Sequence, residues 1–107
     1  MIKKVVKTDD VQFVNPSVKE TFDNLATDFI DDTGKQKLIR YVYNVGFKIV
    51  KAKIGESRSK GNRRSIFLIY AENLNKDSIM LKVEKNGTDL FQLRKCINKG
   101  WQKVVGW

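Results

Sequence analysis

The residues of this sequence best suited to chemistry are lysines and arginines in its middle third. Lys51 and Lys53 lie two residues apart in one apolar stretch, and Arg63 and Arg64 begin the next. The full cationic set is Lys51, Lys53, Lys60, Arg63, Arg64, Lys82 and Lys85. Such a set can bind phosphates and can stabilise the extra negative charge of a pentacovalent phosphate transition state. RNA carries its own nucleophile, the 2′-OH, so its cleavage needs mainly in-line positioning, charge stabilisation and a proton acceptor.

Most other catalytic chemistry is excluded by composition. The sequence contains no histidine, which excludes Ser-His-Asp and Cys-His pairs and every His-ligated metal site. Its single cysteine, Cys96, has no partner for an internal disulfide, and one cysteine makes a structural zinc site untenable. We therefore expect no metal and no cofactor.

The net charge of +9 is concentrated in one part of the chain. Residues 34–68 hold ten basic residues against one acid, whereas residues 1–33 hold four against seven and residues 69–107 hold seven against four. This distribution favours an anionic partner, with nucleic acid first. A basic surface with no dedicated ligand is the alternative.

The length of 107 residues predicts one domain spanning residues 1–107. We expect an α+β fold with an N-terminal strand within residues 1–14, a helical hairpin, a three-stranded antiparallel meander and a C-terminal helix. The first helix is predicted to begin at Asn15-Pro16-Ser17, capped by Asn15 or Ser17. The second is expected over residues 34–45, capped by Asp32 or Thr33, with Gly46 ending it in the left-handed conformation.

From Phe47 the apolar period changes to two, which predicts a strand. Val50, Ala52 and Ile54 are expected to face the helices, and Ile49, Lys51 and Lys53 the opposite side. A mobile polar loop that could cup a phosphate is predicted over residues 55–62. A solvated strand face is the simpler explanation of the lysine pair.

Two further strands and a helix complete the expected meander. Residues 63–71 are predicted to form a central strand buried on both faces, and residues 78–85 the next strand, with Lys82 pointing away from the core. The final helix is expected to begin at Thr88 or Asp89 and to present Leu90, Leu93 and Ile97 on one side.

The order of these elements and several short motifs resemble the RelE/ParE toxin superfamily, and its RelE- and HigB-like branch most. The resemblance covers about Val11 to Lys99. A strand with Lys51-Ala52-Lys53 follows the helical hairpin, and Ser59-Lys60-Gly61-Asn62-Arg63-Arg64 leads into the next strand. Glu84-Lys85-Asn86-Gly87-Thr88-Asp89-Leu90 is similar to a later family segment.

The resemblance implies a toxin of a type II toxin–antitoxin system that cleaves mRNA on the ribosome and inhibits translation. It implies that Lys51, Lys53 and Arg64 bind the scissile phosphate and assist proton transfer, and that Lys85 adds to the charge clamp. The expected nucleic-acid-binding residues are Lys48, Arg58, Lys60, Arg63, Lys82 and Phe91. Phe91 stands where many RNA-cleaving members have a tyrosine or histidine, so it can stack on a base but cannot move a proton.

Two other interpretations stay open. One is a nucleic-acid-binding protein without enzymatic activity, and the other is a ParE-like or protein-binding inhibitor that acts on a target such as DNA gyrase. The expected partners are mRNA on the ribosome and a cognate antitoxin that covers the basic face with an acidic helical segment. Because the sequence has neither a transmembrane run nor a signal peptide, we expect a cytoplasmic protein with no membrane partner.

Overall fold

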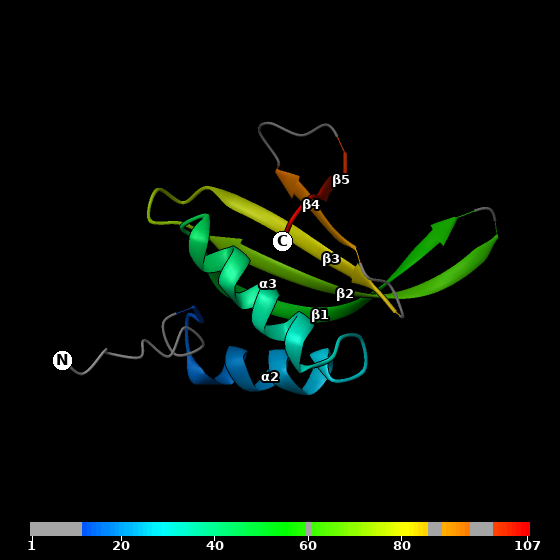
Figure 1. The fold of residues 1–107 in the computed structure, drawn as a ribbon, viewed down its shortest axis with the longest axis horizontal. Helices are drawn as coiled ribbons and strands as arrows, with labels where there is room; N and C mark the ends of the chain where they lie inside the picture. The colour runs from blue at the N-terminus through cyan, green and yellow to red at the C-terminus, as the bar shows by residue number, and fades with distance from the viewer. Residues whose placement is uncertain (1–11, 60, 86–88, 95–99) are drawn as a thin grey trace.

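The computed structural model is an α+β fold in which two helices pack against a five-stranded antiparallel sheet (Figure 1). It describes residues 12–59, 61–85, 89–94 and 100–107, apart from the side chains of residues 57–59, 62 and 63. The elements are α2 Pro16–Ala26, α3 Asp32–Asn44, β1 Lys48–Ser59, β2 Asn62–Glu72, β3 Ser78–Glu84, β4 Leu90–Arg94 and β5 Gln102–Val104. Each strand pairs with its neighbours in sequence, in the order β1-β2-β3-β4-β5. The α+β class predicted from the sequence is confirmed.

The ends of the two helices follow from local hydrogen bonds. The Asn15 side chain accepts a hydrogen bond from the backbone N–H of Val18 at 2.9 Å, and Pro16 opens α2. At α3 the cap is Asp31, which accepts from Gly34 N–H at 2.7 Å, so the prediction of Asp32 or Thr33 was wrong by one or two residues. Gly46 has a φ of +81°, as its place after α3 predicted.

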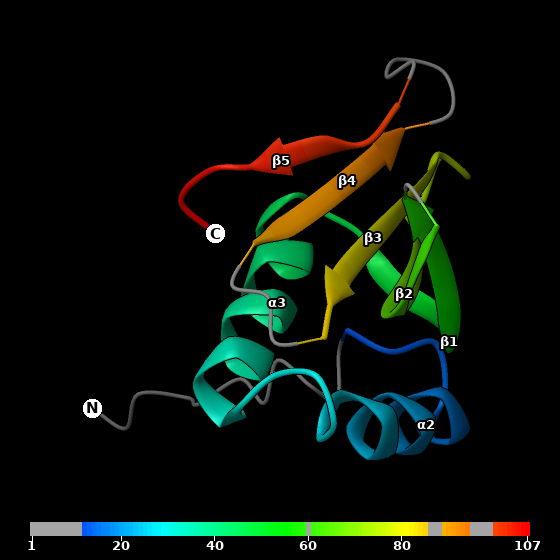
Figure 2. The ribbon, with the colours of Figure 1, turned by 90° about the vertical axis from the view of Figure 1, so that its right-hand side faces the viewer.

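The core lies between the helices and one face of the sheet. Phe22 of α2 is fully buried and contacts Phe67 of β2, with ring centroids 5.4 Å apart. Leu38 and Val42 of α3 are also fully buried in this core. Each such side chain contributes about 1.5–3 kcal/mol by leaving water. Figure 2 shows the twisted sheet curving over α3, so this face of the sheet is covered, and neither of the two described helices lies on the other face.

A β-bulge in β1 decides which side chains reach the core. Ile49 pairs with Ala71 and Lys51 pairs with Tyr70, which leaves Val50 as an extra residue without a partner in β2. After this extra residue, the side chains of β1 point to the opposite faces from those that strict alternation from Ile49 would give. Ile49 is therefore fully buried under the helices, although simple alternation had placed it beside the lysines. Lys51 and Lys53 are exposed on the opposite face, as predicted.

The predicted mobile loop over residues 55–62 is mostly a two-stranded ribbon. Strand β1 continues to Ser59, which pairs with Asn62 at the start of β2, and Gly61 has a φ of +82°. The extended pairing continues because a residue with positive φ closes the hairpin without a longer loop. Figure 1 shows this end of the β1–β2 pair extending past the helices. The prediction of a phosphate-cupping loop was wrong here, since the described backbone forms strands.

The predicted C-terminal helix was also wrong in its described part. Leu90–Arg94 forms β4, which pairs antiparallel with β3, and β5 pairs with β4. Leu90 and Leu93 have a spacing compatible with a helix, but the edge of β3 offers backbone hydrogen bonds. In the strand, Leu90 and Gln92 share the covered face, while Phe91 and Leu93 share the open face. Cys96 and Ile97, which the prediction placed in this helix, lie outside the described residues.

The N-terminal strand prediction falls mostly outside the described residues. Phe13 forms an isolated parallel bridge to Ile49, and Gln12 and Val14 flank it. Ile49 N–H donates to the Gln12 carbonyl at 2.7 Å, and Val14 N–H donates to the Ile49 carbonyl at 2.9 Å. Phe13 also packs edge-on against Phe22 at 5.1 Å. This bridge ties the start of the described chain to the bulge in β1.

A hydrogen bond from Tyr41 to Gln92 links α3 to β4 across the core edge. The Tyr41 hydroxyl donates to the Gln92 side-chain oxygen. Burial raises the pKa of Tyr41 above its ordinary value, and the nearby Arg94 opposes this shift. A neutral phenol suits this position, because a buried phenolate would lose hydration and could no longer donate to Gln92.

We expect Tyr41→Phe to lower the free energy of unfolding by about 0.5–1.5 kcal/mol at neutral pH, because it removes this hydrogen bond. Since the folded-state pKa of Tyr41 is raised, its contribution is present below the unfolded-state pKa, about 10, and is lost as the pH rises through the folded value. The difference between wild type and variant should therefore shrink in alkaline solution. Urea unfolding of both proteins between pH 7 and 11 measures it, and a constant difference would contradict this account.

Candidate nucleic-acid interface

The sheet face opposite α2 and α3, on which no helix of the described residues lies, is called here the open face. It gathers lysines and aromatic rings from all five strands. Residues directly opposite each other on antiparallel strands project to the same side. The pairing therefore aligns one row across the sheet, made of Lys53, Leu68, Lys82, Phe91 and Lys103. The adjacent row contains Lys51, Tyr70, Met80 and Leu93.

One cluster on the open face is formed by Lys51, Lys53 and Tyr70. The ammonium nitrogens of Lys51 and Lys53 lie 5.8 and 5.7 Å from the centroid of the Tyr70 ring. Both lysines are exposed and Tyr70 is half-buried. The ring of Tyr70 therefore holds two cations near one place. Sequence reasoning gave Tyr70 no role, because the pairing of β1 with β2 was not known.

A second cluster is formed by Lys82, Phe91 and Trp101. The Lys82 ammonium lies 5.5 Å from the centroid of the Phe91 ring and 4.6 Å from that of Trp101. Phe91 was proposed to stack on a base, and its position on β4 puts it on the open face beside Lys82. Trp101 was given no role in the sequence analysis, because its place next to Lys82 depends on the pairing of β3, β4 and β5.

An apolar strip joins the two clusters. Leu68 and Ile66 of β2 are 9% and 6% exposed although they lie on the open face. Gly55 lies opposite Ile66 in β1, and a Cβ atom there would stand 2.8 Å from Leu68 Cδ1. The glycine thus lets Leu68 lie flat against β1 between the two clusters. Adjacent strands are about 4.8 Å apart, so Lys53 and Lys82 are separated by roughly 10 Å across this strip.

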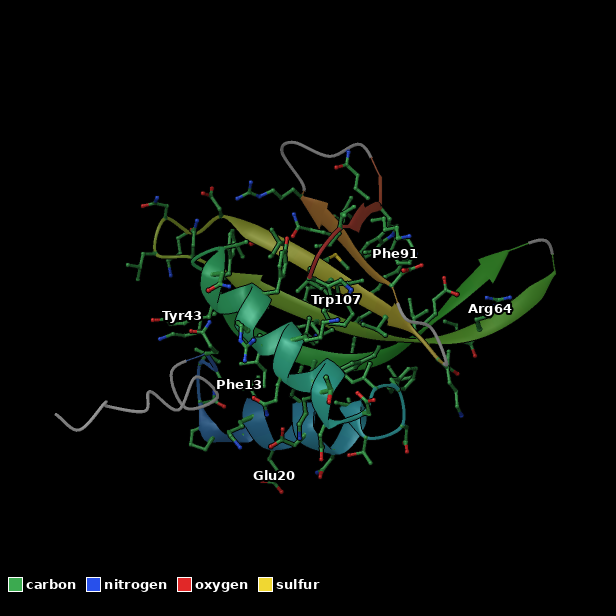
Figure 3. The ribbon with its side chains drawn as sticks, viewed as in Figure 1. Phe13, Glu20, Tyr43, Arg64, Phe91 and Trp107 are labelled. Atoms are coloured by element: carbon green, nitrogen blue, oxygen red, sulfur yellow. The ribbon has the colours of Figure 1, made fainter. Side chains whose placement is uncertain are left out.

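Arg64 lies apart from the two predicted catalytic lysines. It is four residues from Leu68, the partner of Lys53, which is roughly 13 Å along β2. Its guanidinium donates to the Glu84 carboxylate at 3.1 Å, with 67% of the Arg64 side chain exposed. Figure 3 shows Arg64 on the projecting part of the β1–β2 pair, well away from Phe91. The Arg64 guanidinium is therefore directed to Glu84 and does not converge with the ammonium groups of Lys51 and Lys53 beside Tyr70.

The remaining predicted residues are dispersed. Lys48 is exposed at the start of β1, opposite Glu72. Lys85 follows β3, and its N–H donates to the Ser65 carbonyl at 3.3 Å, which places it in alternation with the core-facing Val83 and not with Lys82. Arg58 and Arg63 pair with each other on the projecting ribbon, but their side chains are outside the described part, as is Lys60.

The electrostatics of the open face favour an anion near its centre. Glu84 is engaged by Arg64, and Asp89 forms an ion pair with Lys103 at 3.5 Å. Among the described residues, no carboxylate forms an ion pair with Lys51, Lys53 or Lys82. These three lysines, next to exposed parts of aromatic rings, can attract phosphates while the rings stack on planar groups.

Other kinds of site receive no support from the described residues. They contain no group of three or more Cys, Asp or Glu side chains placed to hold a metal ion. No helix in the described part of the chain is long and apolar enough to cross a membrane.

Comparison with known proteins does not assign the chain to a family. No protein-family model matches the sequence, and no curated protein or solved structure is detectably similar to it.

Proposed function

We propose that this protein binds single-stranded RNA on the open face of its sheet. Messenger RNA on the ribosome, the target implied by the RelE-like motifs, is the leading substrate. The observation that carries the proposal is the pair of lysine–aromatic clusters, Lys51–Lys53–Tyr70 and Lys82–Phe91–Trp101, on one helix-free face. Lysines that neutralise phosphates beside rings that stack on bases are the usual means of binding single strands.

The spacing of the clusters supports a strand that crosses the sheet. The rings stand on β2, β4 and the segment before β5, with the Leu68 strip between them. Stacking on an aromatic ring contributes about 1–3 kcal/mol per base and tolerates any base. A double helix would not reach these rings, because its bases are already stacked on each other.

Replacing both lysines of the first cluster, Lys51→Ala with Lys53→Ala, is expected to weaken binding of a fluorescent oligouridine by at least tenfold in low salt. Two lost phosphate contacts should also reduce the slope of log affinity against log salt by about 1.4, at about 0.7 per contact for a single strand. Fluorescence anisotropy at several salt concentrations measures both quantities.

The matched control is Lys35→Ala with Lys76→Ala, which removes the same charge from α3 and the β2–β3 turn. If the control and the open-face variant lose affinity equally, binding is a property of net charge and the proposal fails. A duplex of the same length that binds as tightly as the single strand would also count against it.

A second candidate function, cleavage of the bound mRNA, is favoured by the position of Tyr70. A phenol beside two lysines supplies a proton-bearing group next to the predicted catalytic pair. In the proposed step the 2′-oxygen bonds to phosphorus while the bond from phosphorus to the 5′-oxygen breaks. The amine of one lysine takes the 2′-OH proton, the Tyr70 hydroxyl gives its proton to the leaving 5′-oxygen, and the products are a cyclic phosphate and a 5′-OH end.

Tyr70→Phe keeps the aromatic ring and removes the hydroxyl group that would give its proton to the leaving 5′-oxygen. We expect it to bind oligouridine within about twofold of wild type but to cut translated mRNA at least a hundredfold more slowly, the usual size of a lost acid–base group. Mapping of transcript ends after induced expression measures the cutting, with Lys51→Ala/Lys53→Ala as the inactive reference. Equal cutting by Tyr70→Phe would exclude Tyr70 as the proton donor. If wild type produces no new transcript ends, the cleavage function is wrong and RNA binding alone remains.

A further inference from the structure

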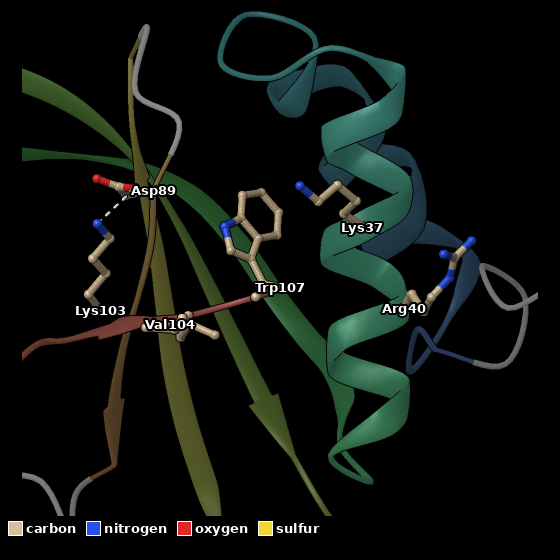
Figure 4. Close-up of a pocket in the computed structure, with 8 residues that line it drawn as sticks. Lys37, Arg40, Asp89, Lys103, Val104 and Trp107 are labelled. Carbon is tan, nitrogen blue, oxygen red and sulfur yellow. Dashed lines mark ion pairs between the residues drawn. The ribbon is translucent and has the colours of Figure 1, made fainter.

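A cavity lies between β5 and α3, at the edge of the sheet farthest from β1. Its volume is about 700 Å³, within the range of roughly 300–1,000 Å³ that small-molecule sites occupy. The lining comprises Lys37 and Arg40 of α3, Asp89, and residues 103–107. Figure 4 shows the indole of Trp107 standing in this space, between the sheet and α3.

Trp107 offers a supported aromatic surface. It is half-buried and packs with Val104 against the core cluster, so its position is fixed on one side. The ammonium of Lys37 lies 4.9 Å from the centroid of its ring, and Figure 4 shows Lys37 reaching toward it from α3. A contact of this kind by an exposed lysine is weak, so a planar group can replace the ammonium on the indole.

Groups of both charges stand around the ring. Lys103 forms an ion pair with Asp89 at 3.5 Å, on the side of Trp107 away from Lys37 in Figure 4. Both side chains are about half exposed, at 58% and 47%, so this pair is readily exchanged for other partners. A displaced Lys37 ammonium can bind an anion, while the Asp89 carboxylate can accept hydrogen bonds from hydroxyl or amino groups. The Arg40 side chain points away from Trp107 in Figure 4 and is not needed here.

We propose that this cavity binds a nucleotide, with its base on Trp107, its phosphate on the Lys37 ammonium and its sugar hydroxyls toward Asp89. An anion alone would not use the indole of Trp107, and an uncharged planar ring alone would not use the Lys37 ammonium. A nucleotide combines a planar ring, hydroxyl groups and a negative charge at suitable separations. Trp107 and Lys37 lie between the sheet and α3, whereas Lys103 at the border of the cavity also belongs to the open-face row. The occupant can be a free nucleotide or the terminal residue of an RNA chain.

The test uses the full chain carrying Trp101→Phe, in which Trp107 is the remaining tryptophan. Adenosine monophosphate should change the Trp107 fluorescence, excited at the red edge of the indole band, in a saturable manner. Adenosine should bind more weakly, and inorganic phosphate should leave the fluorescence unchanged. In the same background, Lys37→Gln should weaken binding of the nucleotide by about tenfold, because it removes the phosphate contact.

Lys35→Gln, on the same helix but outside the cavity, is the matched control and should bind as the parent does. Lys37 is exposed, whereas Lys35 is half-buried and forms an ion pair with Asp23. Circular dichroism should show that both variants keep the fold. Non-saturable quenching, or equal binding by Lys37→Gln and its parent, would overturn the proposal. A short oligonucleotide that saturates Trp107 at lower concentration than the mononucleotide would identify an RNA end as the occupant. Lys51→Ala/Lys53→Ala should retain nucleotide binding, so a failure of this site and of the open face can be told apart.

Discussion

The arrangement of the whole sheet depends on the bulge at Val50. A strand of strict alternation would put Ile49, Lys51 and Lys53 on one face, and either the isoleucine would lose its place in the core or the lysines would be buried there. The extra residue lets Ile49 meet Ala71 under the helices while Lys51 meets Tyr70 on the other side. The Phe13–Ile49 bridge and its two hydrogen bonds to Gln12 and Val14 hold β1 on its outer side at the same point.

The sequence was informative where periodicity and capping act locally. The helical hairpin, the left-handed Gly46 and the buried β2 strand were predicted from residues that are neighbours in the chain. The same reasoning was wrong for segments whose secondary structure depends on pairing with strands distant in the sequence. The segment from Leu90 has apolar spacing that suits a helix, but it lies against the free edge of β3 and becomes a strand. Residues 55–59 are polar enough for a loop, but their partners in β2 extend the ladder.

In the candidate site, too, features set by neighbouring residues were predicted, and features set by the pairing of strands were not. Lys51 and Lys53 were predicted to project together, and the structure places both beside one ring. Their distance from Arg64 could not be predicted, because it depends on the register between β1 and β2, which no local pattern specifies. Tyr70 and Trp101 were overlooked for the same reason. Tyr70 lies beside the lysines only through the register of β1 with β2, and Trp101 becomes visible only once β4 and β5 are known.

The position of Arg64 makes RNA binding better supported than cleavage. Charge stabilisation in a cleavage site requires cations converging on one phosphate. On the open face the cations are distributed, with Lys53 and Lys82 separated by the Leu68 strip and Arg64 held by Glu84 on the projecting ribbon. Distributed cations next to stacking surfaces suit a strand with several phosphates. Cleavage would then depend on the small Lys51–Lys53–Tyr70 cluster and on catalytic groups that the ribosome supplies.

The most direct measurement of the central claim is the change in NMR chemical shifts of the isotopically labelled protein as a short oligouridine is added. The account predicts that the perturbed signals follow the open-face row, with Lys53, Lys82 and Phe91 among the largest changes. Core residues on the covered face, such as Phe22 and Leu38, should remain nearly unchanged. Perturbations confined to the helices or to the tip of the β1–β2 ribbon would contradict the claim that the open face is the RNA-binding surface.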